Sequence, residues 1–350
     1  MKKTLVLVSA LGLAGAACAQ SSVTMFGIVD VTLAHGTGSV SDRTQLLRGG
    51  YSSNRLGFRG VEDLGGGMSA GFWLEAGLNP DDGSGQPTSS NNQASGTPAS
   101  AGGGQGLTFN RRSTISLGGA WGEFRMGRDL TPQYLNLAAG DPFGNVGVGS
   151  VVNYTAIITG VTNTRASNSI AYFSPRLGGF AVHAMHYFGE NSSGAATSSD
   201  GTGDGIRLSY ENGPLQAALA LSRTKYAAGD VKQNNANVTY NFGVVKATAT
   251  YNSDRNGAIA AKGYSLGAWV PIGASEIRAA YSHHRTSAVN NPAAKKISLG
   301  YHYNLSKRSV LYTTFARVRN EGGFAHALNG AATAPNGASN GFDLGIRHSF

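Results

Sequence analysis

Apolar and polar side chains alternate along much of this chain, and the last eleven residues, 340–350, show the alternation most clearly. One face of this segment carries Phe342, Leu344, Ile346, His348 and Phe350, and the other carries Asp343, Gly345, Arg347 and Ser349. This two-residue period predicts a strand with one apolar and one polar face. A strand at the end of a chain exposes unpaired backbone groups unless another strand covers it. We therefore expect the last strand to pair with the first, which would close the sheet into an all-β barrel.

The composition limits how such a barrel could meet a membrane. After the first 19 residues, no apolar run approaches the roughly 20 residues that a membrane-spanning helix needs. Only 13% of the residues are charged, and 51 of 350 are glycine, about twice the usual share. Frequent turns and strands explain that glycine content. The chain is therefore either a soluble β-protein or a protein that crosses a membrane with strands.

Residues 1–19 have the features of a secretory signal peptide. They combine a positive start at Lys2 and Lys3, a short apolar stretch and a small-residue cleavage site. We therefore expect export and a mature domain over residues 20–350. An alternative reading makes Cys18 a lipid-modified cysteine, but glycine stands three residues before it, where a bulky aliphatic residue would be expected.

Loss of the signal peptide also sets the charge and the cysteine content of the mature chain. It removes the only cysteine, so no disulfide can stabilise the fold, and leaves 26 basic against 19 acidic residues, a formal charge of +7. Such a surplus attracts anions, including the phosphates of lipopolysaccharide. The basic residues are scattered among the expected strands instead of forming a patch with interleaved aromatics, which argues against nucleic acid as a partner.

Short and long connections alternate between the expected strands. Early strands are expected at 23–33, 51–63, 68–75, 108–121, 122–128, 167–174 and 179–189; long polar connections at 35–50, 79–107 and 129–165; and roomier loops near 190–203, 225–232, 253–262, 286–293 and 319–339. The whole chain gives about 16 strands, with both ends on the short-turn side. Bacterial outer-membrane barrels have an even strand number, short periplasmic turns and long outer loops. The sequence therefore predicts a 16-stranded antiparallel transmembrane β-barrel.

Several segments carry a family resemblance. Residues 22–27, 55–67, 109–112, 126–128, 168–172 and 345–350 resemble segments of the general porins of Gram-negative beta-proteobacteria. The resemblance implies a homotrimer in the outer membrane, a third loop (129–165) that folds inward to narrow the pore, and a terminal Phe350 read by the outer-membrane assembly machinery. One departure is that this loop has few acidic residues, essentially Asp129 and Asp141.

The alternation also assigns charged side chains to the barrel interior. Basic residues with inward parity are Arg55, Arg59, Arg112, Arg125, Arg207, Lys246, Arg278 and Arg317, and acidic ones are Asp30, Glu75, Glu123, Glu211 and Glu276. An arginine facing lipid at the membrane midplane costs roughly 2 to 4 kcal/mol, which makes parity informative. Arg128 has lipid-side parity at the end of its strand, and its orientation is left open.

These assignments lead to a hypothesis for the pore. Arg55, Arg59, Arg112 and Arg125 would form a basic wall, and Asp129 and Asp141 on the inward loop would face it across a transverse field. Charged rings tune which ions pass, so the basic excess predicts a mild anion preference. Alternatively, several of these arginines pair locally with Glu75 or Glu123 and hold the wall together.

Tyrosines would suit interfacial girdles, where an apolar ring and a polar tip match the membrane boundary. The candidates are Tyr154, Tyr172, Tyr187, Tyr210, Tyr251, Tyr281, Tyr301 and Tyr312, together with Phe350. No run of inward aromatics is visible that would form a sugar-binding track.

The signals for enzymatic activity are poor, and no catalytic, metal-binding or cofactor-binding residues are expected. His283 and His284 are adjacent, so on a strand their side chains point to opposite faces and cannot readily chelate one metal. We expect a passive channel for ions and small hydrophilic solutes, in contact with outer-membrane lipid and lipopolysaccharide. A substrate-selective anion or dicarboxylate channel of the same fold and a non-conducting barrel adhesin remain alternatives.

Overall fold

The computed structural model describes residues 22–89, 91–93, 106–152 and 160–350, so the expected signal peptide and Tyr154 lie outside the described residues. The strands are β1 (Ser22–Gly38), β2 (Arg43–Arg48), β3 (Arg55–Gly65), β4 (Met68–Gly77), β5 (Arg112–Gly119), β6 (Gly122–Leu130), β7 (Arg165–Phe173), β8 (Phe180–Tyr187), β9 (Gly203–Asn212), β10 (Leu215–Thr224), β11 (Val231–Asn241), β12 (Lys246–Asn256), β13 (Ile259–Ile272), β14 (Ser275–Thr286), β15 (Ala293–Asn304), β16 (Ser309–Glu321) and β17 (Ala338–Ser349). A short helix, α1 (Pro132–Ala139), lies between β6 and β7. In the described part of the chain, no helix is both long and apolar enough to cross a membrane.

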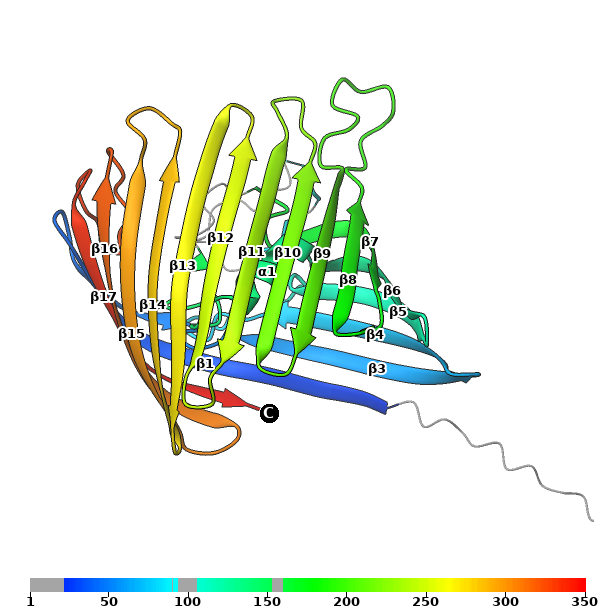
Figure 1. Cartoon of the computed structure of the whole chain (residues 1–350), viewed down its shortest axis with the longest axis horizontal. Coiled ribbons are helices and arrows are strands. Elements are labelled where there is room, and N and C mark those ends of the chain that lie inside the picture. Colours follow the sequence, from blue (N-terminus) through cyan, green and yellow to red (C-terminus); the bar gives the residue numbers. More distant parts are fainter. Residues whose placement is uncertain (1–21, 90, 94–105, 153–159) are drawn as a thin grey trace, which may run out of the picture.

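The last strand pairs with the first, as the sequence predicts. β17 runs antiparallel to β1, with partners from Ile28 and Ser349 to Gly38 and Ser339. Beyond this ladder, Gly27 and Phe350 exchange two backbone hydrogen bonds of 3.1 Å each. From β3 to β17, each strand pairs antiparallel with the next one in the chain, and Figure 1 shows β1 and β17 side by side at the seam. This pairing closes the ring of strands into a barrel.

The barrel has 16 strand positions although 17 strands are present, because β2 and β3 share one position. β3 pairs with residues 22–28 of β1, and β2 pairs with residues 31–36. The six residues between β2 and β3 leave the sheet and fold around Asp30. The Oδ2 atom of Asp30 accepts hydrogen bonds from the backbone N–H groups of Tyr51 (2.9 Å) and Ser52 (2.6 Å). The prediction of a long polar connection over residues 35–50 is therefore wrong in part, because β1 extends to Gly38 and residues 43–48 pair with it as β2.

Short turns and longer connections alternate around the barrel, with the longer ones at one end (Figure 1). The carboxyl terminus lies at the short-turn end. One expected outer loop is absent, because β12 and β13 continue through most of 253–262 and meet in a two-residue turn. Gly257 adopts φ +54° there, a conformation that glycine reaches without steric cost.

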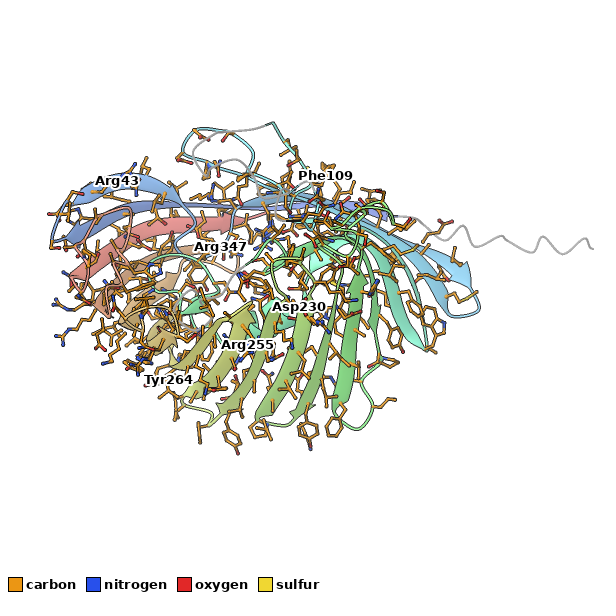
Figure 2. All side chains as sticks on the ribbon, turned by 90° about the horizontal axis from the view of Figure 1, so that it is seen from above. Arg43, Phe109, Asp230, Arg255, Tyr264 and Arg347 are labelled. Atoms are coloured by element: carbon orange, nitrogen blue, oxygen red, sulfur yellow. The ribbon has the colours of Figure 1, made fainter. Side chains whose placement is uncertain are left out.

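The two faces of the barrel wall have opposite character. On β17, Leu344 is 52% exposed whereas the neighbouring Asp343 is 1% exposed, and Figure 2 shows side chains projecting from both faces of the wall. Ring pairs such as Phe180 with Tyr210 lie on the outer face, with centroids 4.6 Å apart. Tyr187 and Tyr312 are fully buried and share the inward parity of their strands, so their expected place in an outer girdle is wrong.

The connection between β6 and β7 enters the barrel instead of extending outward. Its helix, α1, begins with Pro132 at a first-turn position, where proline's missing N–H removes no helical hydrogen bond. The helix lies against β8 to β11, and Figure 1 shows it within the ring of strands. The approach is close, because a Cβ added to Gly140 would lie 2.1 Å from Oγ1 of Thr250 on β12.

Candidate functional site

Seven arginines line the interior along β3 and β5 to β7, and we call them the arginine ladder. Its members are Arg55, Arg59, Arg111, Arg112, Arg125, Arg128 and Arg165. Three carboxylates lie among them, those of Glu75, Glu123 and Asp129. Arginine stays charged at any physiological pH, so this wall carries a permanent positive excess.

Glu75 on β4 pairs with two members of the arginine ladder. Its Oε1 lies 2.5 Å from Nε of Arg111 and 3.5 Å from a terminal nitrogen of Arg55. The indole N–H of Trp73 donates to its Oε2 over 3.1 Å. Glu75 is 6% exposed, so this carboxylate is shared by two arginines in a site with little solvent.

Two further acids, Glu123 and Asp129, pair with members of the arginine ladder. Arg125 donates two hydrogen bonds of 2.8 Å to Glu123, and its other terminal nitrogen lies 3.2 Å from Asp129. Arg112 lies 3.5 Å from the same Asp129 oxygen. Local pairing, the alternative left open above, is therefore the geometry of Arg55 and Arg125. Asp129 is at the end of β6, within the basic wall, and does not face that wall from the inward loop.

Aromatic rings support three of the arginines. The guanidinium carbon of Arg59 is 5.1 Å from the Trp73 ring centroid, that of Arg112 is 4.6 Å from the same ring, and that of Arg125 is 3.9 Å from the Phe173 ring. Cation–π contacts of this length are attractive. Among the described residues, Arg59 has no ion pair, so these rings are what positions it.

Arg128 turns inward despite its lipid-side parity. The pairing of β6 with β7 shifts register between Gly127 and Asp129, and a β-bulge of this kind redirects a side chain. Arg128 then donates from Nε to the Asn110 carbonyl (2.6 Å) and from a terminal nitrogen to Oγ of Ser89 (2.9 Å) and Ser167 (2.7 Å).

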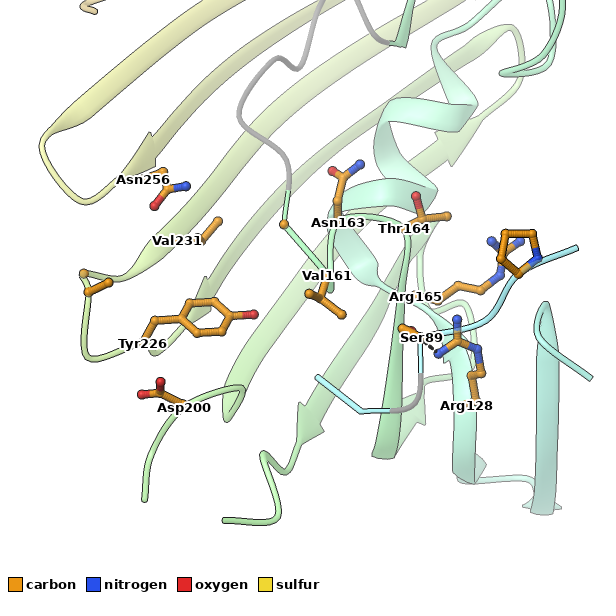
Figure 3. A pocket seen from close by; sticks show the side chains of 14 residues that line it. Ser89, Arg128, Val161, Asn163, Thr164, Arg165, Asp200, Tyr226, Val231 and Asn256 are labelled. Carbon is orange, nitrogen blue, oxygen red and sulfur yellow. Dashed lines mark hydrogen bonds between the residues drawn. The ribbon is translucent and has the colours of Figure 1, made fainter. Parts of the chain in front are cut away.

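Two cavities follow the ladder. One, of about 440 Å³, is lined by Arg48, Arg55, Arg111 and Arg165, and on the other side by residues of the inward connection such as Tyr134 and Asn145. Among its described lining residues there is no carboxylate. The other, of about 710 Å³, has Arg128 and Arg165 on one wall and Asp200, Tyr226 and Asn256 on another (Figure 3). Arg165 borders both cavities, so the arginines form a continuous path.

The inward connection is attached to the far wall along its described length. Asn136 of α1 donates to the Asn235 carbonyl (3.2 Å) and side-chain oxygen (2.7 Å), and its own Oδ1 accepts from Arg207 (3.0 Å). Further along, the Pro142 carbonyl accepts from Arg278 (2.8 Å), and the Ser150 carbonyl accepts from Lys296 (2.6 Å). This bank of the lumen presents amides and carbonyls to the strands and is fixed at several points.

Asp141 shapes the inward connection instead of facing the arginines. Its carboxylate accepts hydrogen bonds from the backbone N–H groups of Phe143 (2.8 Å) and Val151 (3.1 Å) and from the Ser150 hydroxyl (2.8 Å). The residue is 4% exposed. Burial raises the pKa of the Asp141 carboxyl, and these hydrogen bonds act in the opposite direction. Because its oxygens are used within the loop, the structure does not place this carboxylate on the lumen surface.

Parity assigns most of the other inward cations correctly, with one exception. Arg207 and Arg278 contact the inward connection, and Lys246 lies 5.0 Å from the inward Trp269 ring. Arg317 instead shares the outer face of β16 with Leu311 and Phe315 and donates to Asn340 (3.0 Å).

The reason for this error lies in the upper interior of the barrel. Ala316 and Val318 are apolar yet face inward, where they pack with Val148 and Leu328 of two connections that fold into the barrel. The rule that apolar residues face lipid fails where a loop covers the inner wall.

Sequence reasoning missed Arg48, Arg111 and Arg165. Arg165 could have been found, because extending the parity of Ser167 and Ser169 by one step places it inside. Arg111 precedes β5, where no strand period applies, and Arg48 lies on a strand that was not expected. Among the described residues, no three His, Cys, Asp or Glu side chains form a metal-binding group.

Comparisons with known proteins agree with this geometry. A family model described as Gram-negative porin matches residues 4–323. Outer membrane porin protein 32 of Delftia acidovorans is 36% identical over the full length of both chains, and an outer membrane porin protein of Bordetella pertussis is 28% identical, also over both full lengths. The solved structure of an anion-selective porin from Comamonas acidovorans superposes with a TM-score of 0.82 at 35% identity, covering 95% of this chain and 100% of that one.

The family match spans most of the chain, and the solved porin is similar over nearly all of it. The predicted resemblance, the barrel and the outer-membrane location are therefore confirmed. The proteins of this family are channels. The chain thus belongs to the Gram-negative porin family and is a passive diffusion channel of the outer membrane.

Proposed function

We propose that the arginine ladder gives this porin a preference for anions among the small hydrophilic solutes that pass through it. The observation that carries the proposal is the cavity lined by Arg48, Arg55, Arg111 and Arg165, which has no carboxylate among its described lining residues. Fixed charges at a narrow point set which ion enters more readily. The similar solved porin is described as anion-selective, which supports the same preference here.

The preference would come from an unbalanced positive wall. The sequence-based hypothesis needs Asp129 and Asp141 opposite the arginines, but Asp129 is paired with Arg112 and Arg125 and Asp141 is buried in its own loop. Across the cavity from the arginines, the described lining residues of the inward connection, such as Tyr134 and Asn145, are uncharged. We therefore propose that residues 129–165 narrow the pore, and that the field across it arises from arginines facing neutral dipoles.

We also propose that three copies assemble, as in the trimer form of an outer membrane protein of Vibrio cholerae that has a similar fold. Phe350 would serve as the signal for insertion into the membrane, and its ring covers Gly27, where an added Cβ would lie 2.3 Å from the ring. Cleavage after residue 19 would precede both steps. None of these steps involves a chemical reaction catalysed by the chain.

The test is the reversal potential of purified protein in a planar bilayer with different KCl concentrations on the two sides. The double variant Arg55→Gln with Arg165→Gln removes two charges that line the same cavity and should move the reversal potential clearly toward the cation side. The matched control is Lys262→Gln with Arg285→Gln, two cations on the outer face, which should leave it unchanged. Equal shifts in both variants would contradict the proposal.

A selective channel for dicarboxylates is the second candidate, because several arginines converge on one cavity of about 440 Å³. Bidentate pairing with arginine is a strong way to hold a carboxylate. If the cavity binds such solutes, a small dicarboxylate should block chloride current in a saturable manner, and the Arg165→Gln variant should need a higher concentration for half block. If the chloride current falls only in proportion to the share of chloride that the dicarboxylate replaces, without saturation, this second candidate is excluded.

A further inference from the structure

A second set of cations lies on the outside of the barrel, and we call it the outer basic stripe. It consists of Arg223, Lys232, Arg255, Lys262, Arg285 and Lys295, one each from β10 to β15. All six are exposed. Each lies within four residues of the strand end that meets the longer connections, and Figure 2 labels Arg255.

The register places these cations beside one another. Lys232 is the direct cross-strand partner of both Arg223 and Arg255, and Lys262 is the direct partner of Arg285. Directly opposed side chains have Cβ atoms about 4.5 to 5.5 Å apart, and like charges in that position are destabilising. An anion held between the partners would remove this repulsion.

The chain itself supplies few counterions to the stripe. At one end of the stripe, Asp230 lies 2.5 Å from Arg223, and Asp204 is the cross-strand partner of Arg223, although it pairs with His186. At the other end, Glu321 lies 2.7 Å from Lys295 and within electrostatic range of Arg285. In the described ranges no ion pair involves Lys232, Arg255 or Lys262. The centre of the stripe therefore needs negative charge from outside the molecule.

The surroundings indicate where that charge would come from. Two residues further into their strands, the same face carries the exposed apolar side chains Leu221, Tyr264 and Ile297, which a bilayer would cover. Long basic side chains at such a boundary lie along apolar surface and reach the polar head groups.

We propose that the outer basic stripe binds the phosphate groups of an anionic glycolipid in the outer leaflet of the membrane. Adjacent strands would share phosphates, with Lys232 between Arg223 and Arg255 and with Lys262 beside Arg285. The inference rests on the outer-membrane location of the porin and deepens its contact with lipid. It does not depend on the ion preference of the pore.

The experiment measures binding of a diphosphorylated lipid A to the purified full-length porin in detergent, with a chelator present so that divalent cations cannot bridge. The test variant is Lys232→Gln with Arg255→Gln. The control is Lys307→Gln with Arg308→Gln, two exposed cations in the short turn between β15 and β16. A basic residue near an anionic lipid surface contributes about fivefold in affinity, so the test variant should bind roughly 25-fold more weakly. The control should bind as the natural chain does.

Four further arms make the result decisive. Zwitterionic phosphatidylethanolamine and inorganic phosphate should bind weakly to every form, and added salt should weaken the lipid A affinity. The Lys232→Arg variant should retain it. Equal loss in test and control variants, or binding of inorganic phosphate as tight as that of lipid A, would overturn the proposal. Unchanged single-channel conductance shows that the test variant is folded, and ion preference is recorded separately, so failure here leaves the pore proposal standing.

Discussion

The barrel carries two rows of cations that differ in how they are held. Inside, the arginine ladder is interleaved with acids and rings, as in the pairing of Arg111 with Glu75 at 2.5 Å and the stacking of Arg125 on Phe173 at 3.9 Å. Outside, Lys232 and Lys262 have no ion pair within the described ranges and lie beside other cations. The inner row has its geometry fixed by the chain, whereas the outer row is left to its surroundings.

This difference follows from what each face must do. A charge that sorts ions has to stay in one place while solutes pass, so its neighbours must hold it. A charge that meets lipid heads gains from side-chain freedom, because mobile head groups present their phosphates in many positions. Changes to the acids that hold the inner row should therefore affect stability and selectivity together, whereas changes to the outer row should affect lipid binding alone.

The largest effect is expected for Glu75→Gln. This change leaves Arg55 and Arg111 close together without their shared carboxylate, and loss of one partner from a buried ion pair costs about 3 to 5 kcal/mol. The unfolding temperature, followed by circular dichroism in detergent, should fall, while the anion preference in bilayers should rise. An unchanged unfolding temperature would show that the inner row is not held by its acids.

A smaller effect is expected for Asn136→Ala in α1. The side chain bonds Asn235, Asn237 and Arg207, and leaving buried polar groups unpaired costs about 1 to 3 kcal/mol. Loosening this attachment should add open-channel current noise. The matched control is Asn212→Ala, an exposed asparagine at the end of β9 and outside the inward connection, and this variant should leave the current noise unchanged.

Arg165→Gln should change selectivity with little loss of stability. One unit charge about 8 Å from a passing ion in water is worth ~0.5 kcal/mol, or about twofold in the anion-to-cation permeability ratio. Reversal potentials in asymmetric KCl measure this ratio. If Lys262→Gln on the outer face changes the ratio by the same factor, the distinction between the two rows is lost.

The smallest effect is expected for Glu321→Gln, the outer counterpart of Glu75→Gln. The Glu321 side chain is 55% exposed and pairs with Lys295 at 2.7 Å, and exposed pairs are worth about 0 to 1 kcal/mol. The unfolding temperature should stay close to that of the natural chain, while lipid A binding should strengthen slightly because a competing carboxylate is gone. A loss as large as that of Glu75→Gln would contradict the comparison.

Strand period alone predicts the closed barrel and the orientation of most ladder members. The pairing of β17 with β1 and the inward orientation of Arg55, Arg112 and Arg125 need only alternation and the cost of placing arginine in lipid. The same rule fails for Arg317, because neighbouring Ala316 and Val318 face a loop folded into the lumen.

The acidic half of the pore could not be read from the sequence. Whether a loop carboxylate faces solvent depends on the fold of that loop, and Asp141 satisfies N–H groups of Phe143 and Val151 in its own connection. Arg111 and Arg128 depend equally on local features, the approach to β5 and a bulge in β6, that periodicity does not record.

The most direct measurement is the reversal potential of the natural porin, purified and inserted in a planar bilayer with tenfold different KCl on its two sides. Current should flow, because the protein is a channel. The reversal potential should have the sign set by chloride, because arginines outnumber carboxylates along the arginine ladder. Cation preference, or the absence of channel current from correctly folded protein, would contradict the assignment of a positive lumen.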